Sequence, residues 1–147
     1  KPNEIKKISE AIGSQAIIIS IPVKIIDGIA YHFDYLKNNL TKLNIKRIKK
    51  YEHLASELLI IDVDSEGYIG EYNKNIVELF SDINLGLICY GGVGLSKEGT
   101  NLLDIVSVNA VAYGNVLNYG ELFFQKIKKS LSKSKQKLRR SIFRERI

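Results

Sequence analysis

Three acidic side chains and a glycine stand directly after an apolar run, where a strand would end. The run "LLIID" (Leu58–Asp62) continues into Asp64, Glu66 and Gly67. Carboxylates gathered at the mouth of a strand can exchange protons with an amine or a hydroxyl, so Asp64 and Glu66 are candidate catalytic acids or bases. Asp62 is instead a candidate cap of the turn. The plain alternative for all three is a capped loop in solvent.

Glycines follow the next two apolar runs in the same way. The run "LGLICY" is followed by Gly91 and Gly92, and "NAVAYG" ends in Gly114, followed by Asn115. Glycine lets backbone N–H groups approach an anion closely, and a helix N-terminus behind the turn adds positive potential. Two such turns in series favour a phosphate site, although turns also use glycine for its backbone freedom alone. Lys24, after the first run, is either a substrate contact or a solvated lysine.

The apolar runs alternate with stretches of helical spacing, which is typical of parallel βα units. Asp27-Gly28 lies between two apolar arms and predicts a β-hairpin after the first strand. Four βα units form either a small open sheet or half of an eight-stranded barrel, and their order alone does not decide between these. The expected strands are Ala16–Ile21, Leu58–Asp62, Leu85–Tyr90 and Asn109–Gly114, and the expected helices are Pro2–Ile12, Asn38–Leu54, Asn73–Phe80, Lys97–Val106 and Gly120–Leu131.

The composition is that of one globular domain. Of 147 residues, 45% are hydrophobic and 26% charged, and no apolar run approaches the roughly 18 residues that a membrane helix needs. The single cysteine, Cys89, fits a small apolar strand residue in a reducing compartment, so we expect a cytoplasmic protein. His32 and His53 have no ligand-type neighbours at metal-binding spacing. We therefore expect no metal and no cofactor.

The positive charge is concentrated near the C-terminus. From Gln125 to Ile147 ten Lys and Arg stand against one Glu, whereas the rest of the chain carries twelve basic and fifteen acidic residues. A basic tail can bind nucleic acid or an anionic surface. With Phe143 as its only interleaved aromatic residue, a terminal helix that frays in solvent is the favoured interpretation. We expect neither a nucleic acid nor a membrane as partner.

Four segments in order carry a resemblance to a known family. "GSQAIIISIPVK", "ASELLIIDVDSEG", "GLICYGGVG" and "VNAVAYGNVLNYGE" together resemble the C-terminal half of the cyclase subunit of imidazole glycerol phosphate synthase, or of a relative that works with amidotransferases on surface sugars. The likeness covers residues 1–131. It implies an α/β fold in which parallel βα units form the C-terminal half of a TIM (βα)8 barrel, with a β-hairpin inserted after the first strand. The basic tail, residues 132–147, lies outside it.

The resemblance also implies a function, that of a cyclase or lyase-type subunit of a glutamine amidotransferase system. In that family a glutaminase subunit docks at the bottom of the barrel, and ammonia passes through the barrel to a phosphorylated substrate at the top. A half-barrel would need its N-terminal half, or a second copy of itself, to close the sheet. Glu57 matches the family's acidic ammonia gate, Asp64, Glu66 and Gly67 match its Asp-x-Asp-Gly turn, and Gly91, Gly92, Gly114 and Asn115 match, with Gly67, the residues that hold the substrate phosphate.

The chain departs from the family at a catalytic position. Pro22 stands where the family's first strand of this half ends in an acidic residue, and proline has no proton to give. Glu66 replaces an Asp, and Tyr68 stands where the family tends to have Thr. The sequence therefore leaves two hypotheses open: an enzyme, with altered chemistry if it acts on sugars, or a catalytically degenerate barrel remnant that binds phosphate or a partner.

Overall fold

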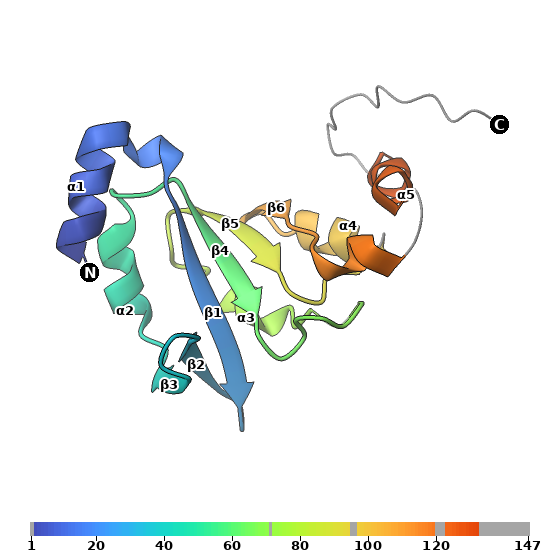
Figure 1. Ribbon diagram of the computed structural model, residues 1–147, viewed down its shortest axis with the longest axis horizontal. Coiled ribbons are helices and arrows are strands. Elements are labelled where there is room, and N and C mark those ends of the chain that lie inside the picture. The colour runs from blue at the N-terminus through green and yellow to red at the C-terminus, as the bar shows by residue number, and fades with distance from the viewer. Residues whose placement is uncertain (1, 71, 95–96, 120–122, 133–147) are drawn as a thin grey trace.

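The computed structural model describes residues 2–70, 72–94, 97–119 and 123–132, which form one mixed sheet with helices packed on it (Figure 1). The six strands lie in the order β3-β2-β1-β4-β5-β6. They are β1 (Ile18–Ile26), β2 (Ile29–Asp34), β3 (Asn39–Lys42), β4 (Glu57–Asp62), β5 (Gly86–Tyr90) and β6 (Val108–Val111). The helices are α1 (Pro2–Ile12), α2 (Ile45–Ile48), α3 (Asn75–Glu78), α4 (Lys97–Leu103) and α5 (Phe123–Leu131), with short 3-10 turns η1 (Ser14–Ala16), η2 (Lys49–Tyr51) and η3 (Asn115–Tyr119).

Four of the strands are parallel, as the alternation of runs predicted. β1 pairs with β4, β4 with β5, and β5 with β6, and all four run in one direction. Their carboxyl ends therefore lie at the same end of the sheet (Figure 1). The acidic loop, residues 63–74 after β4, and the glycine turns after β5 and β6 begin at this end. This is a parallel sheet of βα units consistent with part of a (βα)8 barrel, and the sheet does not close on itself.

The core lies on one face of this sheet. Alternate side chains of β4 and β5 are buried there, including Leu58, Ile60 and Leu87. They form one core cluster with residues of α3 and of the turn after it, such as Ile76 and Phe80. The opposite face is also apolar but only half-buried, and it carries Leu59, Ile61 and Ile88. The sequence predicted strands covered on both faces, but the described part of the chain fully covers only one of them.

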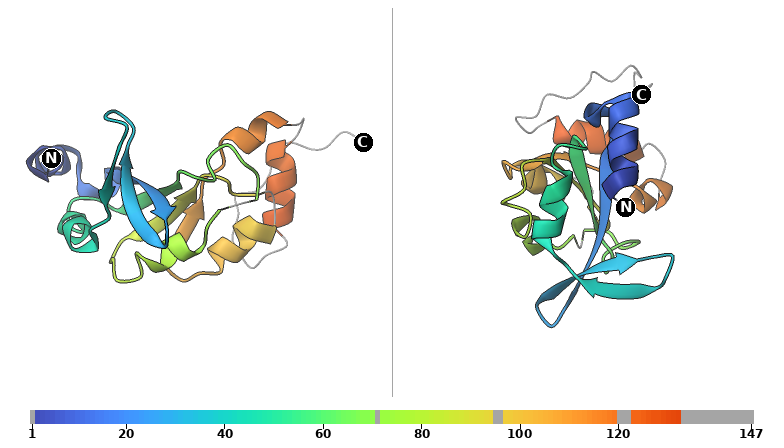
Figure 2. Two further views of the ribbon diagram at one scale, coloured as in Figure 1. Left: turned by 90° about the horizontal axis from the view of Figure 1, so that it is seen from below. Right: turned by 90° about the vertical axis from the view of Figure 1, so that its left-hand side faces the viewer.

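The hairpin forms where Asp27-Gly28 predicted it. Both residues have positive φ, 50° and 75°, which is the backbone of the tight turn that matches strand twist. β2 pairs antiparallel with the second half of β1, from Val23 onward. The hairpin strands diverge from the parallel strands and project away from them (Figure 2).

The predicted helix Asn38–Leu54 is wrong in its first part. Residues Asn39–Lys42 form β3, which pairs antiparallel with β2 and extends the hairpin. Backbone pairing with β2 outweighs the weak local preference for helix of this lysine-rich stretch. A helix begins only at Ile45, where the Asn44 side chain caps it by accepting a hydrogen bond from the Arg47 N–H.

Other predicted boundaries shift by a few residues. The first strand starts two residues later than expected and continues through Pro22 to Ile26, because β2 provides a further pairing partner. The strand Asn109–Gly114 is Val108–Val111, and the helices Asn73–Phe80 and Lys97–Val106 shorten to Asn75–Glu78 and Lys97–Leu103. α5 begins at Phe123, and the expected start at Gly120 lies outside the described residues, as does the basic segment 133–147.

β1 has an open edge along its first half. The carbonyls of Ile17 and Val23 accept hydrogen bonds from Ser56 and Val63, so odd-numbered backbone groups of β1 face β4 and even-numbered ones face away. On that other side, β2 reaches back only to Val23 among the described residues. Pro22 fits here because its missing N–H would point to this edge. The backbone groups of Ile18 and Ser20 also point there.

The open edge predicts self-association. Unpaired strand edges beside half-buried apolar surface pair readily with another chain, so the purified chain should elute with more than the mass of one copy by light scattering. Ile18, 52% exposed at this edge, gives the test variant Ile18→Lys, which should shift the population toward monomer. Leu36→Lys adds the same charge at a 98% exposed hairpin residue and should leave the mass unchanged. A wild-type chain that is monomeric at all concentrations contradicts the half-barrel interpretation.

Candidate functional site

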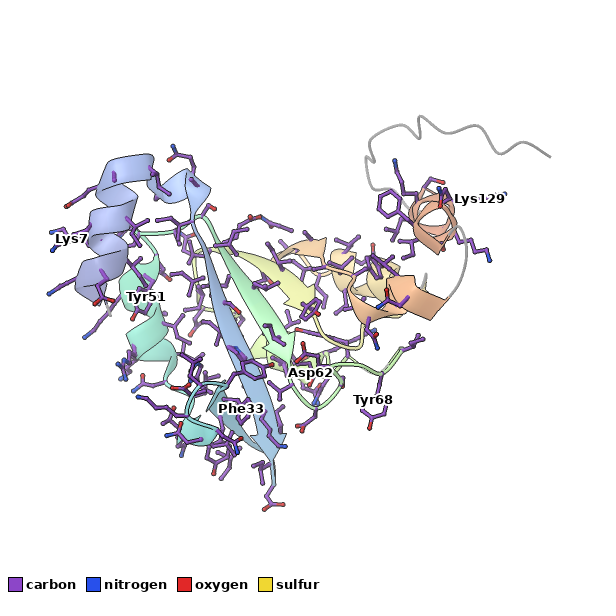
Figure 3. All side chains as sticks on the ribbon, viewed as in Figure 1. Lys7, Phe33, Tyr51, Asp62, Tyr68 and Lys129 are labelled. Atoms are coloured by element: carbon purple, nitrogen blue, oxygen red, sulfur yellow. The ribbon has the colours of Figure 1, made fainter. Side chains whose placement is uncertain are left out.

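A buried carboxylate holds the acidic loop in place. Asp62, the last residue of β4, is only 2% exposed and lies beneath the loop that follows it (Figure 3). Its Oδ2 accepts a hydrogen bond from the Asn73 N–H at 2.8 Å, and its Oδ1 accepts one from the Ser65 N–H at 3.4 Å. One side chain therefore ties both ends of the loop to the end of β4. Asp62 therefore caps the turn, the role that the sequence analysis offered for it.

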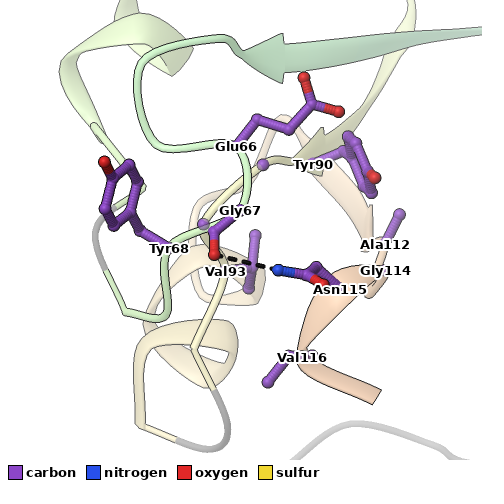
Figure 4. Close-up of a pocket in the computed structure, with 11 residues that line it drawn as sticks. Glu66, Gly67, Tyr68, Tyr90, Val93, Ala112, Gly114, Asn115 and Val116 are labelled. Carbon is purple, nitrogen blue, oxygen red and sulfur yellow. Dashed lines mark hydrogen bonds between the residues drawn. The ribbon is translucent and has the colours of Figure 1, made fainter. Parts of the chain in front are cut away.

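The three strand-end turns meet in one pocket. Its walls come from the loop after β4 and the turns after β5 and β6, and the hollow between them measures about 280 Å³ when its opening to solvent is included (Figure 4). Of the described residues that line it, Glu66 alone is charged. The lining includes all five residues predicted to hold phosphate, Gly67, Gly91, Gly92, Gly114 and Asn115, together with the candidate acid Glu66. The other lining residues are Tyr68, noted in the sequence only as a departure from the family, and four that the sequence did not single out: Tyr90, Val93, Ala112 and Val116.

Gly91 and Gly92 are fixed as glycines by two separate constraints. Both have positive φ, 96° and 71°, a backbone conformation that side chains other than glycine rarely adopt. A Cβ at Gly91 would lie 2.5 Å from the Asp62 carbonyl oxygen, and one at Gly92 would lie 2.6 Å from the Ser65 Cβ. The Gly-Gly turn therefore lets the acidic loop pack directly against the end of β5.

Two hydrogen bonds connect the loop after β4 to the turns after β5 and β6. The Asn115 side-chain amide donates to the Gly67 carbonyl at 3.0 Å, as the dashed line in Figure 4 marks, and the Gly70 N–H donates to the Gly92 carbonyl at 2.8 Å. The loop after β4 is thus joined to both neighbouring turns. Asn115 has a structural role in the pocket wall besides any contact it makes with a ligand.

Tyr90 explains Gly114 in a way that the sequence pattern did not. Gly114 does not have positive φ, but a Cβ there would lie 2.7 Å from the Tyr90 hydroxyl and 2.9 Å from the ring. The tyrosine thus occupies the space beside this turn and forms one wall of the pocket (Figure 4). Its place immediately before Gly91 was the available signal, since it is the last residue of a strand whose end carries the site.

The two candidate catalytic carboxylates have different partners. Asp64 forms an ion pair with Lys24, Nζ to Oδ1 at 3.0 Å, and both side chains are partly exposed. Glu66 accepts a hydrogen bond at 2.8 Å from the Tyr35 hydroxyl, which comes from the hairpin. Lys24 and Asp64 lie at the carboxyl ends of their strands but do not line the pocket, whereas Glu66 does.

Glu57 lies at the opposite end of the sheet. It is the first residue of β4 and stands in register with Ile18 of β1 and Gly86 of β5. That is the end where the parallel strands begin, six residues of β4 away from the acidic loop. The geometry places Glu57 where an entrance to a barrel would be, and its predicted gate role stays a prediction.

Neither a metal centre nor a membrane span is visible in the part of the chain that the structure describes. No three His, Cys, Asp or Glu side chains are grouped there so that they could hold a metal ion. No described helix has the length and apolar character needed to cross a bilayer. Cys89 is buried in the core, and burial raises the pKa of its thiol. The thiol is therefore protonated at neutral pH and acts as a small apolar group.

The arrangement of turns agrees with a family-level match over most of the sequence. Residues 1–123 match the sequence pattern of the family described as histidine biosynthesis protein. The chain belongs to this family. The match includes every predicted site residue, and it ends at Phe123, the first residue of α5.

Relatives in this family are subunits HisF of imidazole glycerol phosphate synthase. The chain is 28% identical over 131 residues to the protein of Saccharolobus solfataricus, covering 87% of this chain and 52% of the relative. It is 33% identical over 129 residues to that of Sulfolobus acidocaldarius, covering 86% and 51%. It is 26% identical to the protein of Methanocaldococcus jannaschii over an alignment of 151 residues, which covers 87% of this chain and 56% of the relative. The chain spans about half the length of these relatives.

Removing the Asp62 carboxylate should release the acidic loop and destabilise the chain. Asp62→Ala leaves two amide donors without their acceptor, which should lower the free energy of unfolding by about 2 kcal/mol in a denaturant titration. Hydrogen exchange at the Ser65 and Asn73 amides should accelerate. Asp64→Ala, which removes an exposed carboxylate two residues away, should change stability by less than about 0.5 kcal/mol. Equal denaturation midpoints for the two variants would contradict this role of Asp62.

Proposed function

We propose that this chain is the C-terminal, phosphate-binding part of a cyclase-type subunit of a glutamine amidotransferase system. Such a subunit incorporates ammonia into a phosphorylated substrate, as in the formation of imidazole glycerol phosphate. The observation that carries the proposal is the convergence of three strand-end turns on one pocket with a single carboxylate at its rim. The names of the relatives support the same reaction class.

Phosphate binding would rest on the backbone of the glycine turns. No described basic side chain lines the pocket, so the attraction must come from N–H groups that the turns bring close to the anion. Gly67, Gly91, Gly92, Gly114 and Asn115 would form this cradle. Glu66 repels a phosphate at short range, so the phosphate would lie toward Gly114 and Asn115 and the organic part of the substrate toward Glu66.

Glu66 and Asp64 would have different roles in catalysis. Glu66 borders the pocket and is the candidate to exchange a proton with the substrate or with ammonia. Asp64, paired with Lys24, would act at the outer side of the site, with Lys24 as the substrate contact. In this proposal, a catalytic carboxylate is missing at position 22, where Pro22 stands in register with Ile61 and, across β4, with Tyr90 of the pocket.

The remaining parts of the system would come from other chains or segments. A glutaminase subunit would supply ammonia at the end where the strands begin, with Glu57 as the gate. An N-terminal half-barrel, or a second copy of this chain, would cover the open edge of β1 and the half-buried face of the sheet. The division into a half-barrel domain, residues 1–131, and a tail, residues 132–147, stays a prediction. The cytoplasmic location also stays a prediction. Amidation of a surface sugar is the related alternative substrate class.

A second candidate function is a binding module without catalysis. Pro22 favours it, because the strand end that would carry a proton donor carries none, while the glycine turns remain intact. In that case the pocket would hold a phosphorylated ligand or a protein partner and turn nothing over. Both candidate functions include the phosphate site, and they differ in whether the chain catalyses a reaction. A measurement of turnover therefore distinguishes them, whereas a measurement of phosphate binding does not.

Filling the space at Gly92 should weaken phosphate binding. A Cβ there would meet the Ser65 Cβ and carbonyl oxygen, and the φ of 71° adds strain, so Gly92→Ala should displace the acidic loop. We expect the affinity for inorganic phosphate, measured by calorimetry, to fall by about tenfold or more. Gly28→Ala has similar strain at a φ of 75° but open space around it, and it should leave the affinity unchanged. Equal phosphate affinities of the two variants would argue against the glycine cradle.

Restoring a carboxylate at position 22 separates the enzyme from the remnant. With ammonium as nitrogen source and an N-terminal half-barrel supplied, Pro22→Asp should raise the rate of imidazole glycerol phosphate formation by about a hundredfold, the lower range of general acid catalysis. Pro22→Asn, of the same shape but without a proton to give, should not. If neither the wild type nor Pro22→Asp turns over substrate, the binding module is the better account.

A further inference from the structure

The inserted hairpin reaches the candidate site through one tyrosine. Tyr35 follows Asp34 at the end of β2, in the turn before β3, and is half exposed. Its hydroxyl donates to Oε2 of Glu66 at 2.8 Å, a contact between residues 31 positions apart. Because Glu66 lines the pocket, this hydrogen bond joins an element outside the parallel βα units to the rim of the site.

Contacts within the hairpin fix the turn that carries Tyr35. Oδ1 of Asp34 accepts hydrogen bonds from the N–H groups of Leu36 and Lys37 at 3.0 and 3.1 Å, which fixes the chain on the far side of Tyr35. The Phe33 ring packs edge-to-face against the Tyr35 ring, with centroids 4.9 Å apart. The position of the Tyr35 hydroxyl is therefore set by the hairpin from both sides of the residue.

The hydroxyl remains a hydrogen-bond donor under ordinary conditions. Partial burial, the hydrogen bond to Glu66 and the charges of Glu66 and Tyr90 together raise the pKa of Tyr35 well above that of free tyrosine. The phenol therefore stays protonated at neutral pH and remains a donor to the Glu66 side chain. Tyr35 therefore holds Glu66 throughout the neutral pH range.

We propose that Tyr35 is a positioning residue, whose hydroxyl fixes the Glu66 carboxylate at the rim of the pocket so that the hairpin sets where this carboxylate meets a ligand. The inference rests on the proposed function, in which Glu66 contacts the organic part of a phosphorylated ligand. A glutamate side chain has three rotatable bonds and samples several rotamers when it is unrestrained. With Oε2 held by Tyr35, Oε1 is left to accept a ligand hydroxyl or amine.

The test compares two ligands that share a phosphate. Inorganic phosphate probes the glycine cradle alone, and glycerol phosphate adds hydroxyl groups that can reach Glu66. For the full chain, calorimetry should show that Tyr35→Phe lowers the preference for glycerol phosphate over phosphate by about three- to tenfold, the range of one hydrogen bond. Glu66→Gln should have a similar effect, and the double variant should lose no more than either single one. Affinity for inorganic phosphate should not change in Tyr35→Phe.

Tyr31→Phe is the matched control. Tyr31 lies on β2, the strand that leads to Tyr35, and its hydroxyl makes no hydrogen bond with the described residues, so its removal should alter neither affinity. An unchanged preference in Tyr35→Phe, or additive effects of Tyr35→Phe and Glu66→Gln, would overturn the inference.

A ligand-free measurement separates this inference from the proposed function. In the chain labelled with carbon-13 at tyrosine Cζ, Glu66→Gln should shift the Tyr35 resonance and leave that of Tyr31 in place, because Tyr35, and not Tyr31, donates to that carboxylate. A Tyr35 resonance that does not respond overturns the positioning role. A wild-type chain that binds neither phosphate nor glycerol phosphate contradicts the phosphate site. The Tyr35 resonance still tests the hydrogen bond between Tyr35 and Glu66 in that case, because it is measured without ligand.

Discussion

The parallel register of β1, β4, β5 and β6 is the constraint on which the site depends. Because neighbouring strands run in one direction, each leaves the sheet at the same edge, and turns separated by more than twenty residues of sequence become neighbours. Three glycine-bearing turns then form one pocket rather than three unrelated loops. The close approach of the loop after β4 to the turn after β5 is possible only because Gly91 and Gly92 lack a Cβ.

The same sheet also shows how much of the architecture this chain contains. Half of β1 has no described partner on the side away from β4, and one apolar face of β4 and β5 is only half-buried. Matches to relatives in the family cover only about half of each relative's length. One edge and one face of the described sheet are therefore left uncovered, and the hairpin occupies only the part of the β1 edge beyond Val23.

Local patterns predicted the parts of the molecule that depend on neighbouring residues in the sequence. Short apolar runs gave the four parallel strands, and Asp27-Gly28 gave the hairpin, because a two-residue turn determines its own geometry. The site glycines were identified from their place after strands. Interactions between distant segments could not be predicted in this way. The local spacing predicts helix for β3, because its pairing with β2 is not visible in its own composition. Tyr35 meets Glu66 only after the hairpin folds back.

The central claim is that the strand-end turns together bind a phosphoryl group through their backbone amides. The most direct measurement is the change in backbone amide NMR resonances as inorganic phosphate is added to the chain. The account predicts that the largest changes map to Gly67, Gly91, Gly92, Gly114 and Asn115. Changes that map instead to the basic C-terminal segment, or to the end of the sheet around Glu57, would contradict it.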